Sequence, residues 1–185
     1  MARVWDDITD AHREFIGSQA VFFVATAPSG DGGHVNVSPK GYDSFRVLNA
    51  HSVAYLDLTG SGAETIAHLR QNGRITIMFC AFVGKPNILR LYGTGTVVLP
   101  ENERYAELVA HFPDLPGARA VIQVDVERVS TSCGYAVPFL KRGEERTQLK
   151  EWAERKGADG LAEYHAEKNL ASIDGLPALP LDGTA

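Results

Sequence analysis

The residues best suited to chemistry lie in a turn of small residues, Thr59-Gly60-Ser61-Gly62, between a predicted strand and a predicted helix. Backbone N–H groups at a helix N-terminus lack intrahelical acceptors and lie at the positive end of the helix dipole, which suits a phosphate group. The hydroxyls of Ser61 and Thr65 add possible donors. The alternative is a structural turn in which Ser61 is the N-cap and Glu64 is its capping-box partner. The turn matches neither a dinucleotide-binding fingerprint nor a P-loop.

Three basic residues lie at positions where a cation has either a structural or a ligand-binding role. Lys40 follows a predicted strand, so it is either a solvated turn lysine or a cation for an anionic ligand. Arg90 lies within a predicted strand, where a buried guanidinium needs a partner. That partner is Asp57 or Glu64 in a structural ion pair, or an anion at a subunit cleft. Arg74 begins a strand and is expected at the surface, paired with a nearby acid.

Histidine and cysteine suggest no metal site and no nucleophile. The six histidines are scattered, and no Cys/His cluster has metal-ligand spacing. Cys80 lies in an apolar run, and Cys133 has no basic residue beside it to lower its pKa, so nucleophilic catalysis is not favoured. We expect two reduced thiols, as in a cytoplasmic protein.

Composition indicates an ordinary globular protein. The chain has 185 residues, of which 44% are hydrophobic and 22% charged, and a formal net charge of −5. The negative charge argues against nucleic-acid binding as a main function. The absence of a long apolar run or a signal-peptide core predicts a cytoplasmic protein without a membrane partner.

The hydrophobic pattern predicts seven strands and a few short helices. Residues 52–58 alternate in period two, with Val53 and Tyr55 on one face and Ala54 and Leu56 on the other. Sequential strands and the mid-strand glycines of residues 88–99 favour a closed or split antiparallel barrel of the α+β class. We expect residues 1–140 to form this barrel. Residues 141–185 are expected to form a helical C-terminal extension, packed on the barrel or on a dimer partner, with helices at 144–156 and 158–168. The other predicted strands span residues 20–27, 34–38, 45–48, 74–82 and 118–129, and further helices are expected at 9–19, 61–72 and 100–111.

The order of these parts resembles that of the pyridoxamine phosphate oxidase-related family of flavin-binding split barrels. The resemblance covers residues 20–138 and rests on several stretches in the same order. They are Val35-Asn36-Val37-Ser38-Pro39-Lys40-Gly41, Leu56-Asp57-Leu58-Thr59-Gly60-Ser61-Gly62 with Glu64-Thr65, His68-Leu69, Gly73-Arg74-Ile75-Thr76, Leu89-Arg90-Leu91-Tyr92-Gly93 and Ser132-Cys133-Gly134-Tyr135-Ala136-Val137-Pro138.

The resemblance implies a homodimer that binds flavin mononucleotide (FMN) at the subunit interface. One departure concerns the start of the helix, where characterised oxidases have an Arg-Lys pair and this chain has Ala63-Glu64. Compensation of the phosphate charge would then rest on Lys40 and the helix dipole, with Arg74 or Arg90 as further candidates. The implied cofactor-binding residues are Val37, Ser38, Pro39, Lys40, Leu58, Thr59, Ser61, Gly62, Glu64, Thr65 and Arg90.

The function that follows is an FMN-dependent oxidoreductase acting on a small organic molecule. Residues for the amine substrate of the oxidases have no counterpart, so oxidation of pyridoxamine phosphate itself is not expected. Two alternatives stay open at this point. One is a flavin- or haem-binding module without catalysis of its own, and the other is a deazaflavin-dependent reductase.

Overall fold

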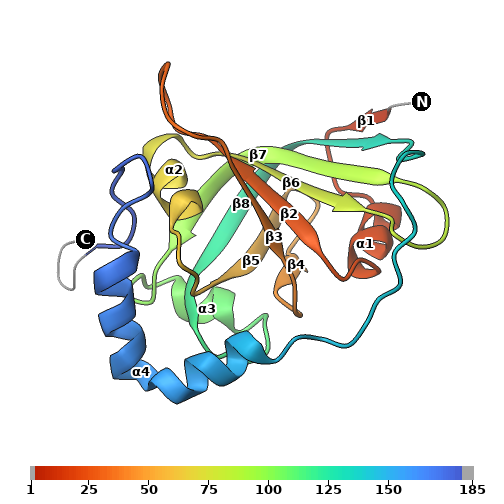
Figure 1. Cartoon of the computed structure of the whole chain (residues 1–185). Coiled ribbons are helices and arrows are strands. Elements are labelled where there is room, and N and C mark those ends of the chain that lie inside the picture. The colour runs from red at the N-terminus through yellow and green to blue at the C-terminus, as the bar shows by residue number, and fades with distance from the viewer. Residues whose placement is uncertain (1–2, 181–185) are drawn as a thin grey trace.

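One antiparallel sheet organises the chain in the computed structural model, which describes residues 3–180 (Figure 1). The strand order is β3-β2-β6-β7-β8-β5-β4, and β1 pairs with β8. The sheet curls into the split barrel of an α+β protein, as predicted. The strands are β1 (Arg3–Trp5), β2 (Phe22–Thr26), β3 (Asn36–Lys40), β4 (Phe45–Val47), β5 (Ser52–Leu58), β6 (Arg74–Cys80), β7 (Ile88–Val98) and β8 (Ala118–Ser132).

The eighth strand, β1, was not predicted. It has three residues, and it pairs with the final residues of β8, from Val129 to Thr131. A segment this short has too few residues to show a period-two pattern, so the pairing depends on the longer strand beside it.

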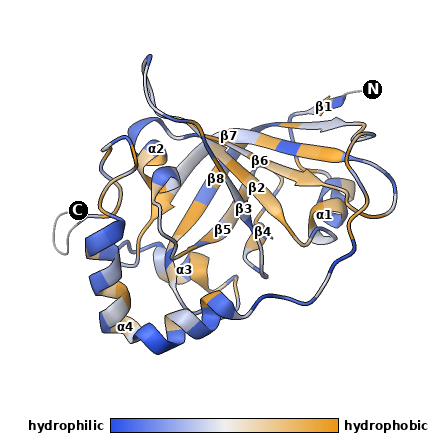
Figure 2. Cartoon of the chain, in the orientation of Figure 1, coloured by the Kyte–Doolittle hydropathy of each residue, from blue (hydrophilic) through white to orange (hydrophobic). Residues whose placement is uncertain are grey.

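Both faces of β5 are buried, which places this strand at the centre of the packing. Val53 and Tyr55 belong to the main core inside the curled sheet. Ala54 and Leu56 belong to a second apolar cluster, beneath the short helix α3 (Tyr105–Val109). The predicted alternation is therefore confirmed, and Figure 2 shows the apolar strands at the centre of the molecule.

The helices begin and end close to the predicted positions, with two corrections. Helix α1 (Asp10–Gly17) is capped by Thr9, and α2 (Glu64–Asn72) ends at Gly73, whose φ of 71° is left-handed. However, the N-cap of α2 is Ala63, and no side-chain hydrogen bond caps it, so the predicted Ser61–Glu64 capping box is wrong. The helix predicted over residues 100–111 is reduced to α3, because its start is a turn.

The C-terminal extension returns to the barrel after a bent helix. Helix α4 (Gln148–Lys168) is interrupted at Gly157, which separates two arms much as the sequence predicts. Trp152 and Tyr164 pack across this break, with ring centroids 5.0 Å apart. Residues 169–180, here called the C-terminal loop, then run beside α2 (Figure 1). Within residues 3–180, no helix is long and apolar enough to cross a membrane.

A bulge in β7 explains one of the two glycines that the sequence marks as a bend. The register with β8 shifts between Tyr92 and Gly93. A Cβ atom on Gly93 would lie only 2.0 Å from the carbonyl oxygen of Asp125 in the neighbouring strand. The two backbones can approach this closely only where a side chain is absent.

We therefore expect Gly93→Ala to lower the free energy of unfolding by about 1–3 kcal/mol, because β7 and β8 must separate. Urea denaturation followed by circular dichroism measures the change. Gly143→Ala is the matched control, since a Cβ there meets no atom within 4 Å. Equal stability of the two variants would contradict the close approach.

Candidate functional site

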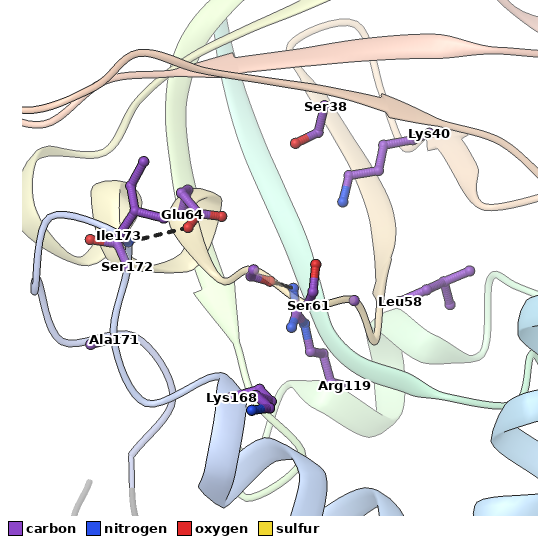
Figure 3. A pocket seen from close by; sticks show the side chains of 12 residues that line it. Ser38, Lys40, Leu58, Ser61, Glu64, Arg119, Lys168, Ala171, Ser172 and Ile173 are labelled. Carbon is purple, nitrogen blue, oxygen red and sulfur yellow. Dashed lines mark hydrogen bonds between the residues drawn. The ribbon is translucent and has the colours of Figure 1, made fainter.

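A cavity of about 570 Å³ opens between the barrel and the C-terminal extension (Figure 3). Strand β3, the end of β5 and the turn before α2 form one part of its wall, and β8 with the C-terminal loop forms the rest. Segments far apart in the sequence therefore share one site. Its lining residues are Ser38, Lys40, Leu58, Gly60, Ser61, Gly62, Glu64, Arg119, Lys168, Ala171, Ser172 and Ile173.

A fully buried carboxylate, Asp57, holds two cations at this cavity. The Nζ atom of Lys40 lies 2.9 Å from Oδ1, and the Nε atom of Arg119 lies 2.7 Å from Oδ2. Burial alone would raise the pKa of Asp57, but the charges and hydrogen bonds of Lys40 and Arg119 outweigh it and lower that pKa. Asp57 is therefore ionised at neutral pH, and one negative charge is shared by two positive charges.

Arg119 connects three parts of the chain. Besides the bond to Asp57, its Nη2 atom donates to the carbonyl oxygen of Gly62 at 2.9 Å. Its Nη1 atom donates to the side-chain oxygen of Asn169 at 2.8 Å, and Asn169 in turn donates to the carbonyl oxygen of Gly60. The guanidinium thus fixes the turn before α2 and the start of the C-terminal loop at once.

The sequence reasoning missed Arg119. The available signal was a lone charge in the otherwise apolar segment Ala118-Arg119-Ala120-Val121-Ile122. Such a residue needs a buried partner. The partner is Asp57, which the sequence reasoning had assigned to Arg90 as one possibility.

The remaining charges of the cavity are Lys168 and Glu64. Lys168 ends α4 and pairs with the neighbouring Glu167 at 2.8 Å. Glu64 lies at the start of α2, where its Oε1 atom accepts a hydrogen bond from the backbone N–H of Ile173 at 3.3 Å. This hydrogen bond ties the Glu64 carboxylate to the C-terminal loop. Glu64 is one of the two residues that stand where the resemblance implies an Arg-Lys pair.

Further contacts hold the C-terminal loop against the barrel. Asp174 lies 2.6 Å from the ring of His34, and Arg70 donates to the carbonyl oxygen of Ala178 at 2.8 Å. Ala178 itself is fully buried in the main core. The loop is therefore anchored at its start by Asn169 and at its end by Ala178.

Apart from Arg90, the predicted cofactor-binding residues fall into three groups. Six line the cavity. Thr59 and Thr65 are buried, and they bond to Gly117 and Asn36 respectively. Val37 and Pro39 are exposed residues of β3 that do not line the cavity. The six lining residues are Ser38, Lys40, Leu58, Ser61, Gly62 and Glu64.

The ion pairs predicted for Arg90 and Arg74 are wrong, whereas the alternative for Arg90, an anion at a subunit cleft, stays a prediction. Arg90 donates to the hydroxyl of Ser132 at 3.1 Å, and it does not line the cavity. Arg74 is exposed as predicted, but it donates to the carbonyl oxygen of Pro28 instead of pairing with an acid. The cations that do reach the cavity are Lys40, Arg119 and Lys168.

Comparison with known proteins identifies the family. Residues 8–133 match the family model described as "Pyridoxamine 5'-phosphate oxidase". The chain belongs to the pyridoxamine 5'-phosphate oxidase family. It is 43% identical over 192 residues to "Pyridoxamine 5'-phosphate oxidase family protein ustO" of Aspergillus flavus, covering 95% of this chain and 77% of that protein.

Solved structures of this family's fold agree with the split barrel. HupZ of Group A Streptococcus, as its H111A variant, aligns with a TM-score of 0.53 and 25% identity, over 68% of this chain and 99% of that one. A Clostridium acetobutylicum protein of the pyridoxinephosphate oxidase family aligns with a TM-score of 0.50 and 16% identity, over 66% and 86%. The second likeness concerns the fold alone.

The buried cluster predicts a large effect of removing the charge of Asp57. We expect Asp57→Asn to lower the free energy of unfolding by about 3–5 kcal/mol, because Arg119 would then be a buried cation without its partner. Asp43→Asn removes the partner of Arg46 in an exposed pair and should cost less than about 1 kcal/mol. Denaturant titration of both variants measures the difference.

The same cluster predicts a pH dependence. An unfolded aspartate titrates near a pKa of about 3.9, and the folded value is lower, so the stabilisation is present above about pH 4. It is lost as the pH falls through the folded pKa. In Asp57→Asn this part of the acid destabilisation should be missing. An unchanged acid profile would contradict the ionised state of Asp57.

Proposed function

We propose that the protein is an FMN-dependent oxidoreductase that acts on a small organic molecule, with the cofactor bound in the cavity described above. The observation that carries this proposal is the cluster of Lys40, Arg119 and Lys168 around the turn before α2. Membership of the pyridoxamine 5'-phosphate oxidase family supports a flavin as the ligand.

The chemistry of the residues fits the phosphate of FMN. The N-terminus of α2 has no side-chain cap, so its positive dipole end is available to an anion. Lys40 and Arg119 are held in place by Asp57, and Lys168 adds a third positive charge. Glu64 opposes the phosphate, but the N–H of Ile173 satisfies one of its oxygens. Lys40, Arg119 and Lys168 bring three positive charges to the cavity, where Asp57 and Glu64 lie opposite them and Glu167 pairs with Lys168.

The protein's part in the reaction would be to bind, orient and shield. FMN, when bound, would supply hydride transfer, and the chain would tune it by hydrogen bonds and charge. Lys40 and Arg119 would hold the phosphate. The C-terminal loop, which forms one wall, would limit the access of water to that end of the cavity. The substrate would meet the cofactor outside this phosphate-binding region.

The absorbance spectrum of the purified protein, followed by titration with FMN, tests the proposal. A two-band flavin spectrum, or saturable binding of about one FMN per chain, is the expected result. Turnover with a nicotinamide donor and an acceptor would separate an enzyme from a binding module. A Soret band after haem addition without flavin uptake, or preference for a deazaflavin, would overturn FMN as the ligand.

Lys40 provides the sharpest test of the phosphate position. We expect Lys40→Ala to weaken FMN binding by about 1–3 kcal/mol, the value of a charge-assisted contact, and to leave riboflavin binding nearly unchanged. Flavin fluorescence quenching measures both affinities. Lys156→Ala, at an exposed lysine of α4 that does not line the cavity, is the control. Unchanged FMN affinity in Lys40→Ala would refute this role.

A homodimer with the cofactor at its subunit interface remains part of the proposal. Strand β3 lies at one end of the sheet, and its flanking Val35 and its own Val37 are 72% and 62% exposed. Tyr135 and Phe139 are exposed as well. Apolar side chains on an unpaired edge strand favour contact with a second copy.

Sedimentation equilibrium should therefore give twice the chain mass of 20.1 kDa. Val35→Lys, which places a charge beside the edge strand, should shift the equilibrium toward the monomer. A monomeric wild-type protein at micromolar concentration, with FMN still bound, would contradict the dimer without contradicting the cofactor site.

A further inference from the structure

A chain of hydrogen bonds leads from the cavity into the core through Asn36. Ser38 lines the cavity, and its hydroxyl donates to the Oδ1 atom of Asn36 at 2.9 Å. The Nδ2 atom of Asn36 donates to the hydroxyl oxygens of Thr65 at 3.0 Å and Thr26 at 3.2 Å. The Thr26 oxygen lies 2.9 Å from the Nδ1 atom of His68.

The inner end of this chain is closed to solvent. Thr26 and Thr65 are buried, and His68 is fully buried. Burial lowers the pKa of His68, so its ring is neutral at pH 7. Among residues 3–180, the Nε2 atom of His68 has no hydrogen-bond partner. These residues come from β2, β3 and α2, so the chain of bonds ties three elements together below the cavity wall.

The donors and acceptors of this chain fix its direction. Asn36 uses both amide protons on the two threonines, and it has only its oxygen left for Ser38. Thr26 accepts from Asn36 and keeps its own proton, and we assign that proton to Nδ1 of His68, which places the ring proton on Nε2. At the outer end, Ser38 spends its only hydroxyl proton on Asn36. Toward the cavity, the Ser38 oxygen is therefore a hydrogen-bond acceptor only.

We infer that Asn36 is a positioning residue that makes Ser38 a hydrogen-bond acceptor toward the bound ligand, so that the ligand group facing Ser38 is an O–H or N–H donor. This inference rests on the proposed flavin site and deepens it. A phosphate or carbonyl oxygen cannot satisfy an acceptor. The hydroxyl groups or the ring N–H of a flavin can donate to Ser38. The cavity therefore has one part that accepts hydrogen bonds from the ligand and another part that binds its anionic end.

The charges agree with this division. Figure 3 shows Ser38 and Lys40 on one side of the cavity and Arg119 with Lys168 on the other. The anionic end of a ligand would lie near Asp57, where the ammonium of Lys40 and the guanidinium of Arg119 meet, and its donor groups would lie beside Ser38. The resemblance implies Ser38 only as a cofactor-binding residue, and the direction of its hydrogen bond assigns it to the donor groups of the ligand.

Two flavins that differ only in the phosphate test this assignment. We expect Ser38→Ala to raise the Kd of FMN and the Kd of riboflavin by the same factor, about threefold to tenfold, as for one lost hydrogen bond. A rise for FMN alone would place Ser38 at the phosphate and overturn the inference, as would no rise for either. Lys40→Ala is the opposite case, because it should affect FMN alone.

A double-mutant cycle tests the positioning role of Asn36. In an Asn36→Ala background, Ser38→Ala should change the riboflavin Kd less than twofold, because Ser38 is no longer held as an acceptor. An undiminished penalty would mean that Asn36 acts only on stability. If Asn36→Ala does not fold, Thr26→Val replaces it, since this change removes one of the two acceptors that hold the amide.

A measurement without ligand separates this inference from the proposed function. Nitrogen-15 NMR of the histidine rings should show His68 as the neutral tautomer protonated on Nε2. Protonation on Nδ1 would make the ring the donor to Thr26 and overturn the direction assigned at the inner end of the chain. Failure of wild-type protein to bind FMN or riboflavin would instead refute the flavin site, and it would leave the tautomer result unchanged.

Discussion

The site depends on one buried negative charge. Asp57 is completely inaccessible to water, and it would be costly there without Lys40 and Arg119 on its two oxygens. The reverse also holds, because a guanidinium that is 5% exposed requires a carboxylate beside it. Asp57 lies one residue before the end of β5, and Arg119 is the second residue of β8. This pairing therefore sets the cavity wall at the point where these two strands meet the turn before α2.

Arg119 also makes the C-terminal extension part of the site. Its bond to Asn169 holds the first residue of the C-terminal loop, and the buried Ala178 holds the end. Between these anchors, the loop supplies Ala171, Ser172 and Ile173 to the cavity. The family model ends at residue 133, so this wall lies beyond the part of the chain that it matches. The C-terminal extension therefore adds a cavity wall to the barrel that the family model covers.

The sequence predicts those features that depend on local pattern. The alternation over residues 52–58, the helix stop at Gly73 and the break between the two arms of α4 all follow from nearby residues. The contacts of Arg119 were not predictable in this way, because Asp57 and Asn169 lie 62 and 50 residues away from it. The Ser61 cap failed for a related reason. A local pattern favoured it, but Glu64 bonds instead to the distant Ile173.

The position of the charges shows where the proposed anion site would take its cations from, since Ala63-Glu64 stand where the resemblance implies an Arg-Lys pair. A positive charge at the start of α2 would add to the helix dipole, whereas Glu64 subtracts from it. Here the cations come from β3, β8 and α4, and they surround the same turn from the other side. The binding of an anion then depends on tertiary packing of the extension, and not on the residues of the turn alone.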